Sequence, residues 1–448
     1  MNKQEHILAR ERIGKALFKL SAPAMVGMLV MALYNLVDTI FVGRGVGVLG
    51  IAGIAIVFPI QMIVMAIAQT VGVGGSSMIS RFIGAQKKQE AEQVLGNIFL
   101  LVFWSSIIIM IGGLIFLRPL LTVFGATETI MPSAIAYARI ILFGTVFFSF
   151  SMASNNVIRA EGNAKAAMIT MLVGAVLNII LDPIFIFGFK MGIAGAAMAT
   201  VISQAIAFSY IVYYFVSDKS MLRLHFKNTK PHMPYIKESL AVGSSSFVRM
   251  ASGSAMALVL NNTLGIFGGD MAIAAFGIIN RILAFVFMPV FGIVQGMQPI
   301  VGYNVGARVF DRVRHAIRLS INTTTGMSFA AFLILIIFPR QLLSIFSDDK
   351  NLLDLGTHAV RIIVIMLPTV GFQAVVSGMY QAMGRAKEAL ILSSLRQIIL
   401  FIPLILLLPH FLGLNGVWYS FFIADFLAVL VTGWMYKREL REIIDKSI

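Results

Sequence analysis

The chain carries one sequence pattern twice, with the second copy displaced by 222 residues from the first. The matched positions include Gly84 with Gly306, Arg139 with Arg361, Gly162 with Gly384 and Lys165 with Lys387. Beyond them, Gly192 matches Gly413 at a displacement of 221, so a single residue was gained or lost between the two groups of matches. A duplicated chain of this kind predicts two similar halves, an arrangement that is common among membrane transporters.

Each half contains six apolar runs that are long enough to cross about 30 Å of hydrocarbon as helices. The runs lie near 16–43, 49–79, 93–117, 131–158, 166–188, 192–215, 238–265, 271–304, 315–338, 356–381, 388–409 and 413–436. With 58% hydrophobic and 12% charged residues, a water-soluble fold is excluded. The sequence predicts an all-α membrane protein with twelve transmembrane helices in two pseudo-symmetric six-helix bundles. We expect the bundles at 1–216 and 238–448, joined by a cytoplasmic linker at 217–237.

The lysines and arginines predict the orientation of the chain. With a cytoplasmic N-terminus, 26 of the 35 fall on the cytoplasmic side, residues 385–396 included, and only 5 fall in the opposite loops. This bias predicts a multi-pass protein of the plasma membrane or bacterial inner membrane with both termini in the cytoplasm. The net charge of +15 then faces the anionic inner leaflet, and nucleic acid is not needed as a partner.

The composition argues against a metal site and against thiol chemistry. The chain has no cysteine, and its six histidines show no metal-ligand spacing. We therefore expect no metal, no cofactor and no enzymatic activity. A membrane-embedded prenyl transferase in particular would need acid-rich metal–diphosphate motifs, which the sequence lacks.

Three acidic residues lie deep in apolar runs, where an ionisable group costs about 2.5–3.5 kcal/mol to insert. They are Asp38, Asp182 and Asp425. Tyr34 precedes Asp38 by four residues and Asn178 precedes Asp182 by four, so each carboxyl has a polar neighbour one helical turn away. Two such carboxyls can share a proton or hold one monovalent cation. The alternative is that they only join helices through hydrogen bonds.

This acid pair belongs to one half alone. At a displacement of 222, Asp38 corresponds to Leu260 and Asp182 corresponds to Leu404. The asymmetry predicts that the first half is specialised for energy coupling.

Several strings of residues resemble the MATE family of multidrug and toxin extrusion transporters. They are Asn-Leu-Val-Asp-Thr-Ile-Phe-Val-Gly at 35–43, Arg-Ala-Glu-Gly-Asn at 159–163 and Asn-Ile-Ile-Leu-Asp-Pro-Ile-Phe-Ile-Phe-Gly at 178–188. Within that family the chain resembles the branch related to DinF and MepA. The resemblance implies a cation site formed by Tyr34, Asp38, Asn178, Asp182 and Thr200, and a hinge at Pro23. An acid within the seventh span, typical of the NorM pattern, is missing from 239–264.

The resemblance implies an antiporter that exports drug-like, often cationic compounds by alternating access, coupled to H⁺ or Na⁺. A flippase for a lipid-linked or polar lipid is the alternative, although its cleft should be rich in cations, for which only Arg249 and Arg281 are obvious candidates. We expect the protein to act as a monomer among membrane lipids. Further residues that we expect to contribute to the cleft, or else to helix packing, are Asp425, Asn155, Gln61, Met31, Met256 and Asn280.

Overall fold

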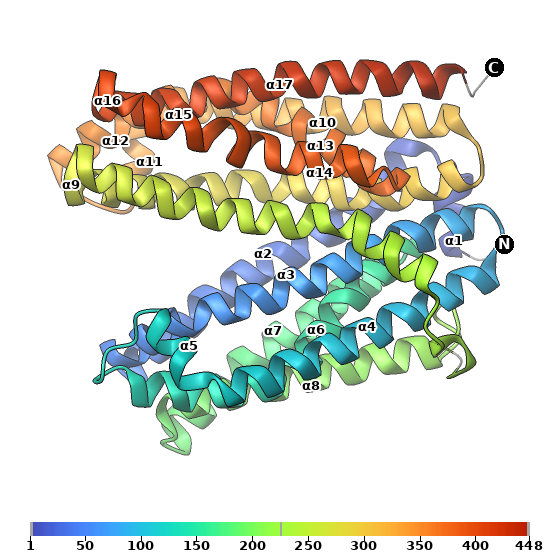
Figure 1. The fold of residues 1–448 in the computed structure, drawn as a ribbon, viewed down its shortest axis with the longest axis horizontal. Coiled ribbons are helices and arrows are strands. Elements are labelled where there is room, and N and C mark those ends of the chain that lie inside the picture. Colours follow the sequence, from blue (N-terminus) through green and yellow to red (C-terminus); the bar gives the residue numbers. More distant parts are fainter. Residues whose placement is uncertain (1–2, 225, 446–448) are drawn as a thin grey trace. The chain divides into compact units, whose positions relative to one another are not determined.

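The structure is a computed structural model that describes residues 3–224 and 226–445. Within these ranges every regular element is helical, and eleven helical segments are long and apolar enough to span a membrane (Figure 1). Helices satisfy their own backbone hydrogen bonds, which is why long apolar segments take this form in lipid. The all-α fold predicted from the apolar runs is confirmed.

The first half contains nine helical segments and a short turn in the linker. They are α1 (Lys3–Ala9), α2 (Ile13–Gly45), α3 (Val48–Gly84), α4 (Lys88–Ile115), α5 (Leu117–Val123), α6 (Met131–Ala160), α7 (Ala164–Pro183), the π-helix η1 (Ile184–Gly188), α8 (Gly192–Val216) and the 3₁₀ turn η2 (Phe226–Thr229). The second half contains α9 (Met233–Gly306), α10 (Phe310–Ile337), α11 (Pro339–Ser344), α12 (Lys350–Ile363), the 3₁₀ turn η3 (Val364–Met366), α13 (Leu367–Met383), α14 (Ala386–Ser394), the π-helix η4 (Leu395–Phe401), α15 (Ile402–Leu407), α16 (Pro409–Leu412) and α17 (Leu414–Asp445).

The long element α9 is two membrane spans joined at a glycine. Its 74 residues would form a rod of about 110 Å at 1.5 Å per residue, far more than a bilayer requires. Gly269 has φ 64° and ψ −166°, outside the helical region, and the chain turns back there (Figure 1). Counting its two limbs separately gives the twelve predicted crossings among the described residues.

The duplication is visible in the backbone itself. Four pairs of residues with positive φ are related by the displacement found in the sequence: Gly47 with Gly269, Gln86 with Arg308, Gly162 with Gly384, and Gly192 with Gly413. Left-handed conformations are uncommon, so their recurrence marks the same turns in both halves. The turns at Gln86 and Arg308 lead directly into the spans α4 and α10, without a separate helix along the membrane surface.

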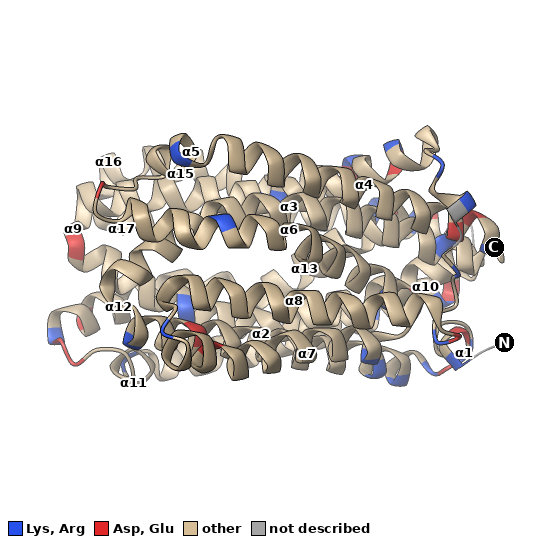
Figure 2. Cartoon of the chain, turned by 90° about the horizontal axis from the view of Figure 1, so that it is seen from below, with Lys and Arg blue, Asp and Glu red and all other residues tan. Residues whose placement is uncertain are grey.

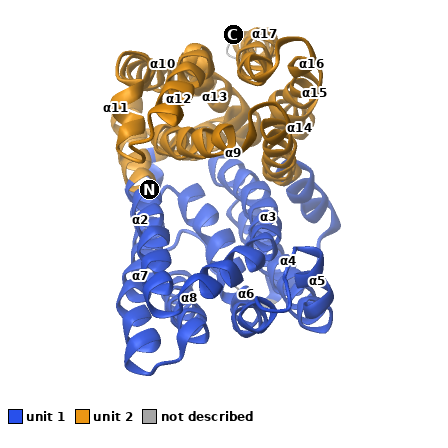
Figure 3. Cartoon of the chain, turned by 90° about the vertical axis from the view of Figure 1, so that its left-hand side faces the viewer, with its two compact units in different colours: residues 1–7, 26–243 blue, residues 8–25, 244–448 orange. Residues whose placement is uncertain are grey.

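The chain divides into two compact units, which do not coincide with the predicted bundle boundaries (Figure 3). Unit 1 comprises Met1–Ile7 and Val26–Gly243, and unit 2 comprises Leu8–Met25 and Ser244–Ile448. The beginning of α2 therefore packs with the second half, and the beginning of α9 packs with the first. In each unit, charged residues gather toward the helix ends and leave long uncharged stretches between them (Figure 2).

Glycines allow close helix crossings in both units. In unit 1, a Cβ atom on Gly74 of α3 would lie 1.7 Å from the carbonyl oxygen of Ser239, and one on Gly243 of α9 would lie 1.8 Å from that of Thr70. In unit 2, a Cβ on Gly296 would lie 2.1 Å from Oγ of Ser21. Small residues let helix backbones approach in this way inside membranes.

The linker between the halves is anchored along unit 1. Asn97 of α4 is 2% exposed, donates from Nδ2 to the carbonyl oxygen of Lys230 at 3.3 Å, and accepts from the backbone N–H of His232 at 2.8 Å. The Arg223 backbone N–H donates to Oε1 of Glu92 at 3.1 Å. The linker thus follows a defined course across the ends of the helices.

Candidate functional site

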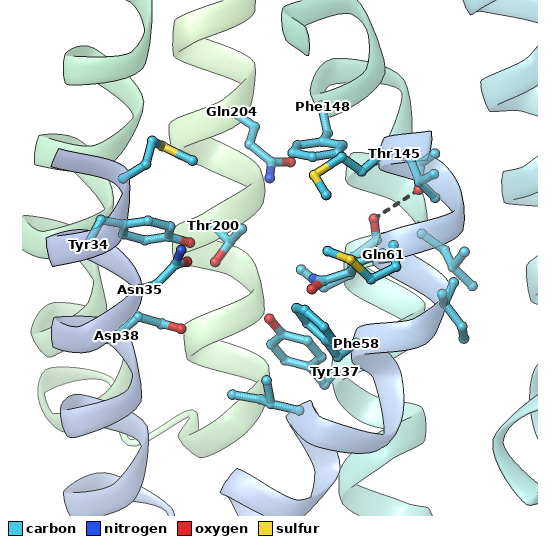
Figure 4. Close-up of a pocket in the computed structure, with 18 of the residues that line it drawn as sticks. Tyr34, Asn35, Asp38, Phe58, Gln61, Tyr137, Thr145, Phe148, Thr200 and Gln204 are labelled. Carbon is cyan, nitrogen blue, oxygen red and sulfur yellow. Dashed lines mark hydrogen bonds between the residues drawn. The ribbon is translucent and has the colours of Figure 1, made fainter. Parts of the chain in front are cut away.

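A cavity of about 420 Å³ lies inside unit 1, between α2, α3, α6 and α8 (Figure 4). Aromatic and methionine side chains form much of its wall, and Asp38 is the one charged residue among the described residues that line it. The lining residues that contribute aromatic, sulfur or polar groups are Met31, Tyr34, Asn35, Asp38, Thr39, Phe58, Gln61, Met62, Met65, Tyr137, Thr145, Phe148, Thr200 and Gln204.

Asp38 and Asp182 lie within hydrogen-bonding reach of each other. Asp38 faces the cavity from α2, whereas Asp182, at the end of α7, is completely buried. Neither carboxyl forms an ion pair with a Lys, Arg or His of the described chain. The structure therefore brings the two predicted acids together without a fixed positive charge.

Asn178 connects this acid pair to α8. With its amide nitrogen turned toward the carboxyl, it donates to Oδ2 of Asp182 at 2.8 Å, and its oxygen accepts from the backbone N–H and Oγ1 of Thr200, both at 3.2 Å. Tyr34 is in turn within hydrogen-bonding reach of Thr200. All five residues of the predicted cation site thus lie in one connected cluster.

The opposite wall contains polar residues that the sequence did not reveal. Tyr137 of α6 is 4% exposed, faces Asp38 and lies within hydrogen-bonding reach of Gln61 (Figure 4). Gln204 follows Thr200 by one helical turn on α8, so the same i, i+4 spacing that pointed to Tyr34 and Asn178 could have identified it. Tyr137 has no such local signal, because Asp38 and Gln61, the polar residues that it approaches, come from other helices.

The other predicted cleft residues fall in different places. Met31 and Gln61 line the cavity. Asn155 instead joins α6 to α7, because its Oδ1 accepts from Oγ1 of Thr170 at 2.6 Å. In unit 2, Met256 packs against the hydrophobic core, and Asn280 is exposed.

The two arginines considered for anion binding, Arg249 and Arg281, are also exposed in unit 2. Neither makes a hydrogen bond or ion pair with another described residue, and neither lines the cavity. Pro23 lies inside α2, in the part of that helix that belongs to unit 2. The cavity and the predicted hinge therefore use different parts of one helix.

Asp425 has a partner that was not foreseen. Asp425 pairs with Arg396 through two hydrogen bonds. Arg396 had been counted among the cytoplasmic charges of 385–396, whereas it lies in η4, inside the span Ala386–Leu412. That part of the charge count was wrong, because one arginine in a long apolar run can be stabilised by an acid that is distant in sequence.

The leucines that replace the acid pair in the second half have a structural role. Leu260 is 1% exposed in the core of unit 2, and Leu404 packs against the same cluster. At these two positions of the second half, apolar side chains that pack in the core thus replace the carboxyls of the first half. Among the described residues, no group of three or more His, Cys, Asp or Glu side chains could hold a metal ion.

A further buried acid, Glu161, lies just beyond the end of α6. It is fully buried and accepts hydrogen bonds from the Tyr214 hydroxyl at 2.8 Å, the Ser220 hydroxyl at 2.7 Å and the Met221 backbone N–H at 3.2 Å. Burial raises the pKa of Glu161 to about 7, although these hydrogen bonds act to lower it. This acid fastens the beginning of the linker to the first half.

Comparisons with known proteins agree with these observations. The MatE family model matches residues 23–184 and again residues 246–407. The chain is 27% identical to the multidrug export protein MepA of Staphylococcus aureus, over 96% of this chain and 94% of that protein. It is 46% identical to the solved structure of the MATE multidrug transporter DinF-BH, with a TM-score of 0.90 and 98% of each chain covered. A MATE structure in the bent conformation is 30% identical, with a TM-score of 0.94 over 100% of this chain and 99% of that one.

Proposed function

This chain belongs to the MatE family, and on that premise we propose that it is a multidrug exporter that works by cation-coupled antiport. Entry of a proton, or of a sodium ion, would drive drug-like organic cations out of the cell. The relatives described above support the export of drugs, and the acid pair in unit 1 supports the coupling. The distribution of lysine and arginine supports a location in the plasma or bacterial inner membrane with both termini in the cytoplasm. We propose that the protein acts there as a monomer.

The coupling proposal rests on one observation: Asp38 and Asp182 lie together without a cationic side chain beside them. Two adjacent carboxylates away from water are costly unless a positive charge is added. Because no Lys, Arg or His of the described chain pairs with Asp38 or Asp182, that charge must come from outside the protein. A proton or a monovalent cation meets this need and can leave again.

Helix α2 supplies a physical link between the ion and the cargo. It contributes Asp38 to the acid pair and also contributes Met31, Tyr34, Asn35 and Thr39 to the cavity wall. A change in the position of α2 on cation binding would therefore alter the cavity directly. Coupling requires that the cation bind more tightly to one of the two states of the transporter.

The cavity wall indicates the class of cargo. A volume of about 420 Å³ lies within the range of small-molecule sites. Methionine and aromatic side chains adapt to varied flat molecules, and one carboxyl favours a single positive charge. A lipid-diphosphate flippase is less well supported, because no Lys or Arg lines this cavity.

Efflux from proteoliposomes under separately imposed proton and sodium gradients tests the proposal. Asp38→Asn and Asp182→Asn preserve the size of the side chain but cannot bind and release a proton, so each should abolish gradient-driven efflux. Asp311→Asn is the matched control, since Asp311 is exposed and pairs only with Arg314 among the described residues. Normal gradient-driven efflux by both site variants would place the coupling elsewhere.

A further inference from the structure

Unit 2 contains an ion pair at membrane depth. Nε of Arg396 donates to Oδ1 of Asp425, and Nη2 donates to Oδ2 at 3.2 Å. The Asp425 side chain is 5% exposed and that of Arg396 is 30% exposed. Arg396 lies in η4 and Asp425 in α17, both inside segments long enough to span a membrane. The two-point geometry fixes the guanidinium on the carboxylate.

The charges of the two units are balanced differently. In unit 1 the acids Asp38 and Asp182 have no cationic side chain beside them, and a π-helix, η1, begins two residues after Asp182. In unit 2 a π-helix, η4, carries the cation that neutralises the acid. Such segments frequently occur at functional sites, where they displace a side chain from its ordinary helical position. Each unit thus has a carboxylate near a π-helix. Only in unit 2 does a side chain of the protein, that of Arg396, supply the neutralising positive charge.

A further polar side chain lies beside residue 425. Gln373 of α13 donates to the Asp425 carbonyl oxygen at 3.5 Å and to Oγ1 of Thr369 at 3.4 Å. The elements packed against α17 include α10, α12, α13, α15, α16, η3 and η4. Of these, only η4 supplies a charged side chain that pairs with Asp425 in the described chain.

We infer that unit 2 contains a latent binding site for a monovalent cation, centred on the Asp425 carboxylate, whose permanent occupant is the chain's own Arg396. A guanidinium keeps its charge at every accessible pH and is tied to the backbone, so it cannot exchange with a solution ion. Hard cations prefer oxygen ligands, which the Asp425 carboxylate supplies. Removal of the guanidinium should therefore expose a carboxylate that recruits Na⁺ or a proton.

Thermal unfolding of the purified full-length chain tests this inference without relying on transport. All variants would carry Asp38→Asn and Asp182→Asn, which silences the acid pair of unit 1. The unfolding midpoint would be measured from pH 5.5 to 8.5, with sodium replaced by N-methylglucamine at constant ionic strength. Arg396→Gln should lower the midpoint by about 5 °C in the absence of sodium at high pH, because it leaves a buried acid unpaired.

The expected signature is recovery by added cation. Sodium or acid should raise the midpoint of Arg396→Gln in a saturable way, whereas Arg396→Lys, which retains a positive charge, should show no such response. Adding Asp425→Asn to Arg396→Gln should restore the midpoint and remove the response. A cation response that persists in this double variant, or its absence in Arg396→Gln, overturns the inference.

The double variant also decides the case in which Arg396→Gln does not fold. Folding of Arg396→Gln with Asp425→Asn would show that the unpaired acid prevents folding of the single variant, as the inference requires. If neither variant folds, the shape of the arginine, rather than its charge, is needed at this place. That outcome would contradict the inference.

Discussion

Asp38 and Asp182 lie within hydrogen-bonding reach although α2 and α7 are separated in sequence by four other helices. Asp38 faces the cavity and Asp182 lies buried behind it. In the proposed coupling, a cation that enters through the cavity would meet Asp38 first. The second carboxyl, held by Asn178, would already be oriented.

We expect Asn178→Ala to weaken this preorganisation. The change removes a hydrogen-bond donor to Asp182 and an acceptor for Thr200. A buried polar group left without its partner lowers the free energy of unfolding by about 1–3 kcal/mol. The unfolding midpoint should fall, and the dependence of efflux on external pH should shift. Thr200→Val is the milder comparison, since the backbone N–H of Thr200 keeps its bond to Asn178. Equal effects of the two substitutions would contradict this assignment.

Glu161 should make the stability depend on pH in a defined direction. Its pKa rises from 4.5 to about 7 on folding, so the folded protein holds this proton more tightly than the unfolded chain does. The free energy of unfolding should therefore fall as pH rises from 4.5 to about 7, and this contribution should be level above pH 7. The shift corresponds to about 3 kcal/mol.

Glu161→Gln should remove that fall, because glutamine carries no charge. Its Oε1 can still accept from Tyr214 and Met221, and its Nε2 can donate to the Ser220 hydroxyl. Chemical unfolding at several pH values from 4.5 to 8 measures the effect. Glu92→Gln, at an acid that also contacts the linker, serves as the control. A slope in Glu161→Gln equal to that of the natural protein would assign the pH dependence to other groups.

The close crossing of α3 and α9 should not tolerate a methyl group. Gly74→Ala and Gly243→Ala would each place a Cβ less than 2 Å from a backbone oxygen. The helices would have to separate, at a cost of about 1–3 kcal/mol each. Gly112→Ala, in α4 with no atom within 4 Å of the added Cβ, should instead be neutral or stabilise by up to about 1 kcal/mol. Thermal unfolding of the three variants in detergent provides the comparison.

Asn97→Ala should release the linker from α4. The change removes the hydrogen bonds to Lys230 and His232, which together hold this segment by about 2 kcal/mol. Trypsin cleavage after Lys227 should become roughly tenfold or more faster, since proteolysis follows the population of the open form. Cleavage at an unchanged rate would show that the linker is held by other contacts.

Local regularities in the sequence predicted a large part of this protein. Tyr34 with Asp38 and Asn178 with Asp182 were recognisable because residues four apart share a helix face. The twelve spans followed from apolar length, and the duplication followed from matched positions. Each of these signals can be read within a short stretch of chain or between two stretches in register.

Contacts between spans were harder to predict. Arg396 and Asp425 lie 29 residues apart on neighbouring spans, and nothing in either local sequence indicates the other. Tyr137 likewise approaches Asp38 only through the packing of α6 near α2. Such pairs depend on how helices rotate against one another, which hydrophobic periodicity constrains weakly when a helix is apolar on every side.

The division of α2 and α9 between the units makes each half of the chain dependent on the other. Leu8–Met25 completes the second unit, and the beginning of α9, up to Gly243, completes the first. This exchange of equivalent segments is what a domain-swapped dimer would retain after fusion of its two genes. Cutting the chain at the linker would consequently yield two fragments that each lack a segment needed for their own unit, so we expect neither half to fold without the other.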